Sequence, residues 1–192
     1  MWLTIIIYKI LGENILKLDL RQMILVSLFA ALTAVGAFIT IPFQPVPFSL
    51  QTLFTLLAGM VLGSVAGPAS QIIYIFLGII GLPVFAGFKS GIGILIGPTG
   101  GFIFGFVISV YAIGRITEKK ETINIFRYLL AGSLGTVLIY FFGIIQLSMI
   151  TGIGMKNALF VGALPFLPGD ILKIAAASFI AHKLNMTSFV QK

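Results

Sequence analysis

An acid and an amine, Asp170 and Lys173, stand three residues apart in an apolar stretch near the end of this chain. On a helix, that spacing places both side chains on one face. Charged side chains within a membrane-spanning helix are costly and usually face a cavity or a partner group. One interpretation is an internal ion pair that holds the helix against its neighbours. The other is a binding site, in which Asp170 accepts N–H bonds from a ligand while Lys173 neutralises Asp170 or binds a ligand oxygen.

A glycine-rich stretch, residues 81–105, holds a second group of candidates. Glycines such as Gly87 let a backbone approach a ligand closely. Lys89 is either a solvated loop lysine or the counter-charge for an anionic ligand group. Thr99 and Gly100 lie where the next helix is predicted to begin, and the free backbone N–H groups and the dipole of a helix start suit an anion. Lys89 and this helix start would together suit a carboxylate.

Polar side chains also occur in the apolar stretches that precede the glycine-rich one. Gln51, Thr52, Gln71 and Tyr74 need hydrogen-bond partners at such depth. Hydrogen bonds between helices would satisfy them, and ligand recognition is the alternative. Phe85 could supply an apolar wall, although the chain holds 18 phenylalanines and each one is weak evidence.

Composition excludes several kinds of chemistry. The chain has no cysteine and one histidine, His182, so thiolate metal sites, cysteine nucleophiles and histidine-based metal or Ser–His sites are not expected. No GxxxxGK[ST] motif for binding nucleotide phosphates occurs, and the five acids form no cluster. We therefore expect neither an enzyme nor a bound metal or cofactor. The basic residues collect at the ends of apolar stretches, which is typical of a membrane protein and not of a nucleic-acid-binding one.

The elements that must position these residues are membrane-spanning helices. Of the 192 residues, 59% are hydrophobic and 9% are charged, and the mean hydropathy is +1.15, whereas soluble domains carry about 25% charged residues. About 20 apolar residues cross a bilayer as a helix. The sequence predicts an all-α membrane protein, a bundle of six transmembrane helices at residues 23–41, 50–66, 70–82, 99–117, 126–150 and 161–181. Residues 1–20 are expected to form an interfacial lead-in, and residues 21–192 the membrane domain.

Helix breakers set the expected boundaries of these spans. Three prolines between residues 42 and 47 are expected to make a stiff, extended connection. Gly67 and Pro68 are expected to end the second span. Residues 151–160 are expected to form a loop.

The distribution of lysine and arginine predicts the orientation. Nine of these twelve residues fall on the side that holds both termini, and two, Lys89 and Lys156, fall on the opposite side. Because cytoplasmic segments carry the excess of basic residues, we expect both termini in the cytoplasm. The glycine-rich loop between the third and fourth helices would then face the outside of the cell membrane.

Four segments of the chain resemble the BioY family, whose members are biotin-specific S-components of energy-coupling factor (ECF) transporters. The segments are PFSLQTLFTLLAGMVLG (47–63), SQIIYIFLGIIGLPVFAG (70–87), GIGILIGPTGGFIFGF (91–106) and PFLPGDILKIAAAS (165–178). GPTGG following LPVFAG, together with PGDxLK, makes the resemblance specific. It runs from about residue 21 to residue 183.

The resemblance implies a six-helix bundle with a biotin pocket near the outer face, capped by loops, to which Asp170 and Lys173 belong. The ureido group of biotin has two N–H donors, which Asp170 could accept, and one acceptor; the Gln71 amide could serve both kinds of group. The valerate carboxylate needs a positive region, from Lys89, from Lys173 or from the start of the fourth helix. An S-component for another vitamin and a stand-alone secondary carrier are the alternatives.

The resemblance also implies protein partners. Ala30 and Ala34 have the AxxxA spacing that lets another helix approach closely, either within the fold or from a partner. In the family, this signature on the first helix docks on the transmembrane coupling subunit, and an ATPase pair drives transport through that subunit. The absence of a nucleotide-binding motif in this chain agrees with an energy source on other subunits.

Overall fold

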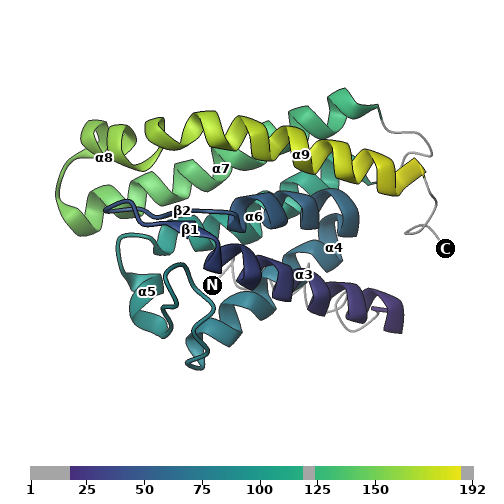
Figure 1. Cartoon of the computed structure of the whole chain (residues 1–192), viewed down its shortest axis with the longest axis horizontal. Helices are drawn as coiled ribbons and strands as arrows, with labels where there is room; N and C mark the ends of the chain where they lie inside the picture. The colour runs from purple at the N-terminus through teal and green to yellow at the C-terminus, as the bar shows by residue number, and fades with distance from the viewer. Residues whose placement is uncertain (1–17, 119–123, 187–192) are drawn as a thin grey trace, which may run out of the picture.

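The computed structural model describes residues 18–118 and 124–186, and helices make up most of it (Figure 1). The long helices lie side by side along the long direction of the molecule: α3 (Leu20–Phe38), α4 (Gln51–Ile79), α6 (Gly100–Thr117), α7 (Ile125–Thr151) and α9 (Leu167–Met186). Short elements gather at the left end of Figure 1: the strands β1 (Thr40–Ile41) and β2 (Phe48–Ser49) and the helices α5 (Ile92–Ile96) and α8 (Met155–Gly162). The prediction of a helical protein is confirmed at this level.

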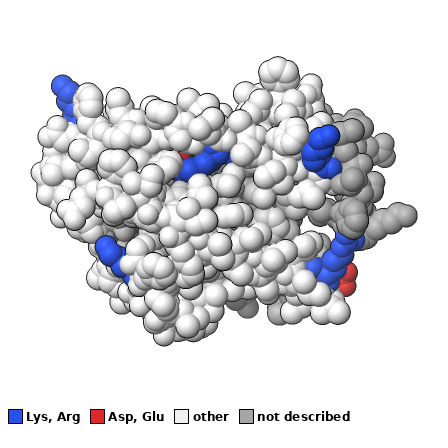
Figure 2. Space-filling view, in the orientation of Figure 1, with Lys and Arg blue, Asp and Glu red and all other residues white. Residues whose placement is uncertain are grey.

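The outer surface of the helices is suited to lipid. Within the described residues, five helical stretches are long and apolar enough to cross a membrane, and the last of them joins α8 to α9. Large apolar side chains such as Met149 and Leu172 are more than 70% exposed, and Figure 2 shows few charged groups on a broad uncharged face. Soluble proteins rarely expose large continuous apolar patches. The chain is therefore a multi-pass membrane protein.

The first helix begins earlier than its apolar run suggests because Asp19 caps it. The Asp19 carboxylate accepts a hydrogen bond from the Leu20 N–H at 2.7 Å, and the Gln22 side chain accepts one from the Asp19 N–H at 3.2 Å. This reciprocal arrangement satisfies donors that a helix start otherwise leaves free. The predicted span 23–41 is accordingly shifted to Leu20–Phe38.

The small side chains of α3 face inward. Ala30 is 1% exposed and Ala34 is 8% exposed, on the same helix face as Thr33, whose hydroxyl is reached by the Gln71 amide from α4. Ala30 and Ala34 therefore pack within the bundle in this structure, and their contact with a partner subunit stays a prediction. Their small volume lets α3 pack closely within the bundle.

The proline-containing connection after α3 is a hairpin. β1 and β2 pair antiparallel, with Thr40 opposite Ser49, and the predicted extended connection is wrong because the chain turns back within residues 42–47. Leu50 N–H then donates to the Gly36 carbonyl at 3.0 Å. The hairpin thus returns the chain to the end of α3 and places Phe48 and Ser49 above the bundle.

Helix α4 folds back on itself at Gly63, where φ is +78°. Thr55 Oγ1 donates to Gln71 Oε1 at 3.3 Å, and Gln51 Nε2 donates to the Tyr74 hydroxyl, although these residues are 16 and 23 positions apart. Sixteen residues of a straight helix would separate such groups by about 24 Å. Residues 51–62 and 64–79 are therefore two antiparallel halves.

The turn in α4 is held by the end of α6. The Glu118 carboxylate accepts hydrogen bonds from Ser64 N–H at 2.9 Å and from Ser64 Oγ at 2.8 Å. The break was predicted at Gly67 and Pro68, which is wrong, because Gly63 alone adopts the left-handed backbone of the turn. Pro68 lies near the start of the second half, the part of a helix that best tolerates proline.

The later helices follow the sequence more closely. The bounds of α6 and α7 agree with the predicted spans 99–117 and 126–150 to within a residue. The predicted loop 151–160 is wrong in its second part, because Met155–Gly162 forms α8. A 3₁₀ turn, η2 (Leu164–Phe166), then leads into α9.

Four of the seven described basic residues lie at one end of the bundle. Arg21 and Arg127 lie in the first turns of α3 and α7, and Arg115 and Lys183 lie in the last turns of α6 and α9. In Figure 1 this is the right-hand end, opposite the hairpin and α5. The remaining basic residues of the predicted cytoplasmic set, Lys9, Lys17, Lys119, Lys120 and Lys192, lie outside the described residues, as does most of the predicted lead-in 1–20.

Candidate binding site

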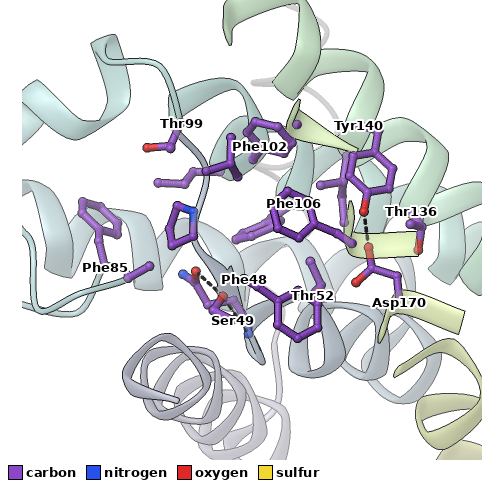
Figure 3. Close-up of a pocket in the computed structure, with 18 of the residues that line it drawn as sticks. Phe48, Ser49, Thr52, Phe85, Thr99, Phe102, Phe106, Thr136, Tyr140 and Asp170 are labelled. Carbon is purple, nitrogen blue, oxygen red and sulfur yellow. Dashed lines mark hydrogen bonds between the residues drawn. The ribbon is translucent and has the colours of Figure 1, made fainter. Parts of the chain in front are cut away.

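A cavity of about 90 Å³ lies among α4, α6, α7 and α9, beneath β2 and the glycine-rich loop (Figure 3). We call it the inner cavity. Its walls are mostly aromatic and aliphatic, with a few polar groups, a composition typical of small-molecule sites. The aromatic side chains that line it are Phe48, Phe85, Phe102, Phe106, Tyr140 and Phe166.

Asp170 and Lys173 line the inner cavity from the start of α9. Lys173 Nζ donates to Asp170 Oδ1 at 2.9 Å, and both residues are about 5% exposed. The Tyr140 hydroxyl of α7 donates to the other oxygen, Asp170 Oδ2 (Figure 3). Lys173 Nζ also lies 3.8 Å from the centre of the Phe48 ring, a favourable position for a cation. Asp170 and Lys173 thus form an internal ion pair and also line the cavity.

Phe48 is fixed over this pair by Phe166 and Gly169, which precede Asp170 in the chain. Its ring stacks on Phe166 with centroids 5.9 Å apart. A side chain at Gly169 would place a Cβ 2.3 Å from the Phe48 ring, so only glycine allows this approach. The hairpin and α9 therefore close the inner cavity together, which explains why the proline-rich connection must return to the bundle.

A polar relay lies beside the inner cavity on α4. Ser49 Oγ donates to Gln51 Oε1 at 2.9 Å, Gln51 Nε2 donates to Tyr74, and the Tyr74 hydroxyl donates to the Val84 carbonyl at 3.1 Å. Gln51 lines the cavity, whereas Tyr74 does not and is fully buried behind it. The relay ties the glycine-rich loop to α4.

Gln71 lies deeper and away from the inner cavity. Its side chain is fully buried and bonds to Thr33, Thr55 and Ser70. Of the two interpretations of its sequence position, the structure places Gln71 in hydrogen bonds between helices. It does not line the cavity.

A buried polar atom of the cavity lining has no partner. Thr52 Oγ1 is buried and makes no hydrogen bond within the described structure. A buried unpaired hydroxyl costs about 1–3 kcal/mol, whereas the nearby Thr136 hydroxyl donates to Gly132 O at 3.0 Å. Thr52 therefore offers a lining hydroxyl to a ligand.

The glycine-rich loop contributes unevenly. Phe85, Lys89 and Thr99 line the inner cavity, and Gly87 lines a neighbouring one. Gly100 lines neither, because it packs against α5: a Cβ there would lie 1.7 Å from the Leu95 carbonyl oxygen. Phe85 is held in place because Gly78 leaves room for its ring.

The expected anion site at the start of α6 is only partly available. The N–H of Gly97 donates to the Ile94 carbonyl, and the N–H of Gly100 donates to the Gly97 carbonyl. These two donors were expected to be free, and they are not. Gln146 Nε2 of α7 caps the same loop, donating to the carbonyls of Leu95 and Gly97 at 2.7 Å. Lys89 is exposed and forms no ion pair among the described residues, so it is the more accessible positive group.

Sequence reasoning missed several lining residues. Tyr140 and Phe48 are the most important, since both contact the Asp170–Lys173 pair. A tyrosine in the middle of a predicted span was a usable signal, because a buried hydroxyl needs a partner. Phe48 gave no such signal, as its place depends on the hairpin and on Gly169.

Comparisons with known proteins identify the family. A model of the BioY family matches residues 12–188. The chain belongs to the BioY family. Biotin transporter BioY of Thermotoga maritima is 42% identical over 166 residues, covering 86% of this chain and 96% of that protein. A probable biotin transporter BioY of Pyrococcus horikoshii is 43% identical with the same coverage.

A solved structure has the same fold. The crystal structure of the S-component for biotin from an ECF-type ABC transporter matches with a TM-score of 0.77 and 28% sequence identity, covering 86% of this chain and 91% of that one. The described part of this BioY chain holds no group of three His, Cys, Asp or Glu side chains that could bind a metal.

Proposed function

We propose that this chain is a biotin-binding S-component, the substrate-capture subunit of an ECF-type uptake transporter. The observation that carries the proposal is the buried Asp170–Lys173 pair, which opens onto an aromatic cavity in a chain of the BioY family. Buried charges are costly unless paired, and a charged pair at a cavity wall offers both an acceptor and a donor to a polar ligand. A ureido group needs both.

The ureido ring binds at the Asp170 end of the inner cavity. Each Asp170 oxygen has one protein donor and retains a second lone pair, which can accept a ureido N–H. The Lys173 ammonium has further donors for the ureido oxygen. Thr52 Oγ1 supplies another hydrogen bond where none is made within the protein, and Phe48, Phe102 and Phe106 enclose the apolar rings.

The valerate chain runs toward the glycine-rich loop, where Lys89 receives the carboxylate. Lys89 lines the same cavity from the loop, whereas Asp170 lines it from α9. Its lack of an ion pair in the described structure supports this role. Phe85, Thr99 and Gln51 line the same cavity and complete the site.

The molecule crosses the cell membrane six times, with both termini in the cytoplasm. Five continuous helical stretches of the described residues are long and apolar enough to cross a membrane, and α4 is one of them. Its two antiparallel halves each count as one span, which supports a total of six spans. The described basic residues at the helix ends opposite the inner cavity support a cytoplasmic position for that end. The cavity and its loops then face the outside.

Transport requires partner subunits. The sequence holds no nucleotide-binding motif of the GxxxxGK[ST] type, so an ATPase pair supplies the energy through a transmembrane coupling subunit. Ala30 and Ala34 on α3 are the proposed contact with that subunit, although both are buried against the bundle in this chain alone. Exposed apolar residues of α3, such as Met23, Ile24 and Leu28, face outward from the same helix.

A titration of the purified chain tests the proposal. Isothermal titration with biotin, riboflavin and thiamine in detergent compares three vitamins of different chemistry. We expect saturable binding of biotin at one site per chain and no binding of the other two vitamins. The dissociation constant for biotin should be nanomolar, which corresponds to a binding free energy of about −12 kcal/mol. Preference for another vitamin would reassign the substrate, and uptake by the chain alone in ATPase-free vesicles would indicate a stand-alone carrier.

A further inference from the structure

A second and larger cavity adjoins the inner one on its outer side. It measures about 360 Å³ and lies between the β1–β2 hairpin loop and the glycine-rich loop. We call it the outer chamber. Its own lining comes mainly from the hairpin, including Thr40, Phe43 and Gln44, and from Gly87 of the opposite loop. None of these residues lines the inner cavity.

The two cavities share part of their walls. Pro47, Ala86 and Lys89 line both. A residue can line two cavities only where they meet, so the boundary between them is about one side chain thick. Lys89 is the charged residue of this boundary, and its exposed side chain has no ion partner among the described residues. An anionic group could reach Lys89 from either side.

The chemistry of the outer chamber differs from that of the inner cavity. Its lining combines proline rings and Phe43 with the Gln44 amide. Thr40 Oγ1 already donates to the Ala37 carbonyl, whereas the Gln44 side chain makes no hydrogen bond in the described structure and is exposed. Such walls suit a short flexible chain with a polar end better than a rigid apolar ring.

We infer that the outer chamber is a second subsite, which accepts the tail of a biotin amide when that tail ends in a carboxylate. The inference rests on the proposed function, because it requires biotin to lie in the inner cavity with its valerate end at Lys89. Conversion of the valerate carboxylate to an amide removes the charge that Lys89 binds. A tail that extends into the outer chamber and bears its own carboxylate restores that charge beside Lys89.

Four ligands separate this inference from biotin binding itself. They are biotin, biotin primary amide, N-biotinyl-β-alanine and the neutral N-biotinyl-β-alaninamide, each titrated into the purified chain. We expect the primary amide and the neutral tailed amide to bind at least about tenfold more weakly than biotin, and N-biotinyl-β-alanine to recover to within about threefold of biotin. Equal weakness of all three amides would overturn the inference.

A variant that fills the chamber provides the second test. Gln44→Trp places a large ring in the outer chamber, and Ser90→Trp is the matched control on an exposed loop position that lines neither cavity. We expect Gln44→Trp to weaken N-biotinyl-β-alanine by at least about tenfold while biotin changes less than about twofold. Equal effects on both ligands would contradict a separate subsite. If biotin itself fails to bind the wild-type chain, the proposed function is wrong and the subsite is lost with it.

Discussion

At the scale of single residues, the costliest feature is the pair of charges at the start of α9. Burial of Asp170 and Lys173 removes two ions from water, at several kcal/mol each. The 2.9 Å contact, the Tyr140 hydroxyl and the Phe48 ring offset much of that cost. Two apolar side chains at these positions would hold α9 equally well without this desolvation cost. The pair is therefore best explained by the polar ligand that it can recognise.

Removal of one charge should destabilise the protein more than removal of both. Asp170→Asn leaves a buried ammonium without its counter-ion, and we expect a loss of about 3–5 kcal/mol of unfolding free energy. Asp170→Asn combined with Lys173→Met should regain most of it. Thermal unfolding in detergent measures both, with Asp19→Asn, at an exposed cap, as the control. A double variant as unstable as the single one would show that the pair does not act as a unit.

Thr52→Val tests the unpartnered hydroxyl. The substitution keeps the shape of the side chain and removes an oxygen that has no partner in the described structure, so stability should be equal or slightly higher. Biotin affinity should fall by about 1 kcal/mol if the ligand supplies the missing partner. Thr136→Val, which removes a lining hydroxyl already bonded within α7, is the control. Unchanged biotin affinity in Thr52→Val would remove Thr52 from the site.

Residue spacing revealed only part of this site. The three-residue spacing of Asp170 and Lys173 placed both on one face, and the structure brings both to the inner cavity. Tyr74 and Gln71 are also polar residues in apolar stretches, yet they bond within the bundle. Sequence does not show which polar side chains meet a cavity, because the packing of neighbouring helices decides it.

At the scale of elements, backbone turns decide where the site residues lie. The left-handed Gly63 folds α4 into two halves, which brings Gln51 opposite Tyr74 and places Thr52 at the cavity. The β1–β2 hairpin carries Phe48 over α9 in a similar way. Apolar length predicted α6 and α7 well. It failed at Gly63, because the turn lies inside a long apolar run, and at α8, because glycines and the polar Lys156 and Asn157 are typical of a loop.

Gly63→Ala should destabilise the turn in α4. Alanine at φ +78° is strained, and its Cβ would lie 3.0 Å from the Glu118 carboxylate that holds Ser64. We expect a loss of about 1–2 kcal/mol in unfolding free energy. Gly93→Ala, where nothing lies within 4 Å of the new Cβ, is the matched control in thermal unfolding. Equal effects of the two substitutions would mean that the turn carries no special strain.

At the scale of the whole molecule, charge separates the two ends of the bundle. The described arginines and Lys183 lie near the end opposite the loops that cover the inner cavity. This separation supports the proposed outward-facing orientation of the site. In that proposed orientation, a ligand from outside would reach the outer chamber before the inner cavity.

The absence of native cysteine makes the orientation directly measurable. Ser90→Cys lies in the glycine-rich loop and Asp19→Cys at the start of α3, and both positions are exposed. In intact cells, a membrane-impermeant maleimide should label Ser90→Cys at once and Asp19→Cys only after the membrane is permeabilised. The reverse pattern would place the site on the cytoplasmic side.

Contact between the ureido group of biotin and the Asp170–Lys173 pair is the central feature of the proposed site. A thermodynamic cycle measures that contact: biotin and a ureido N-methyl biotin are titrated into the wild-type chain and into the double variant Asp170→Asn/Lys173→Met. We predict that N-methylation costs about 1.5 kcal/mol or more in the wild type and little in the variant, a coupling typical of groups in contact. Equal losses in both proteins would contradict the account, because the ureido group would then bind elsewhere.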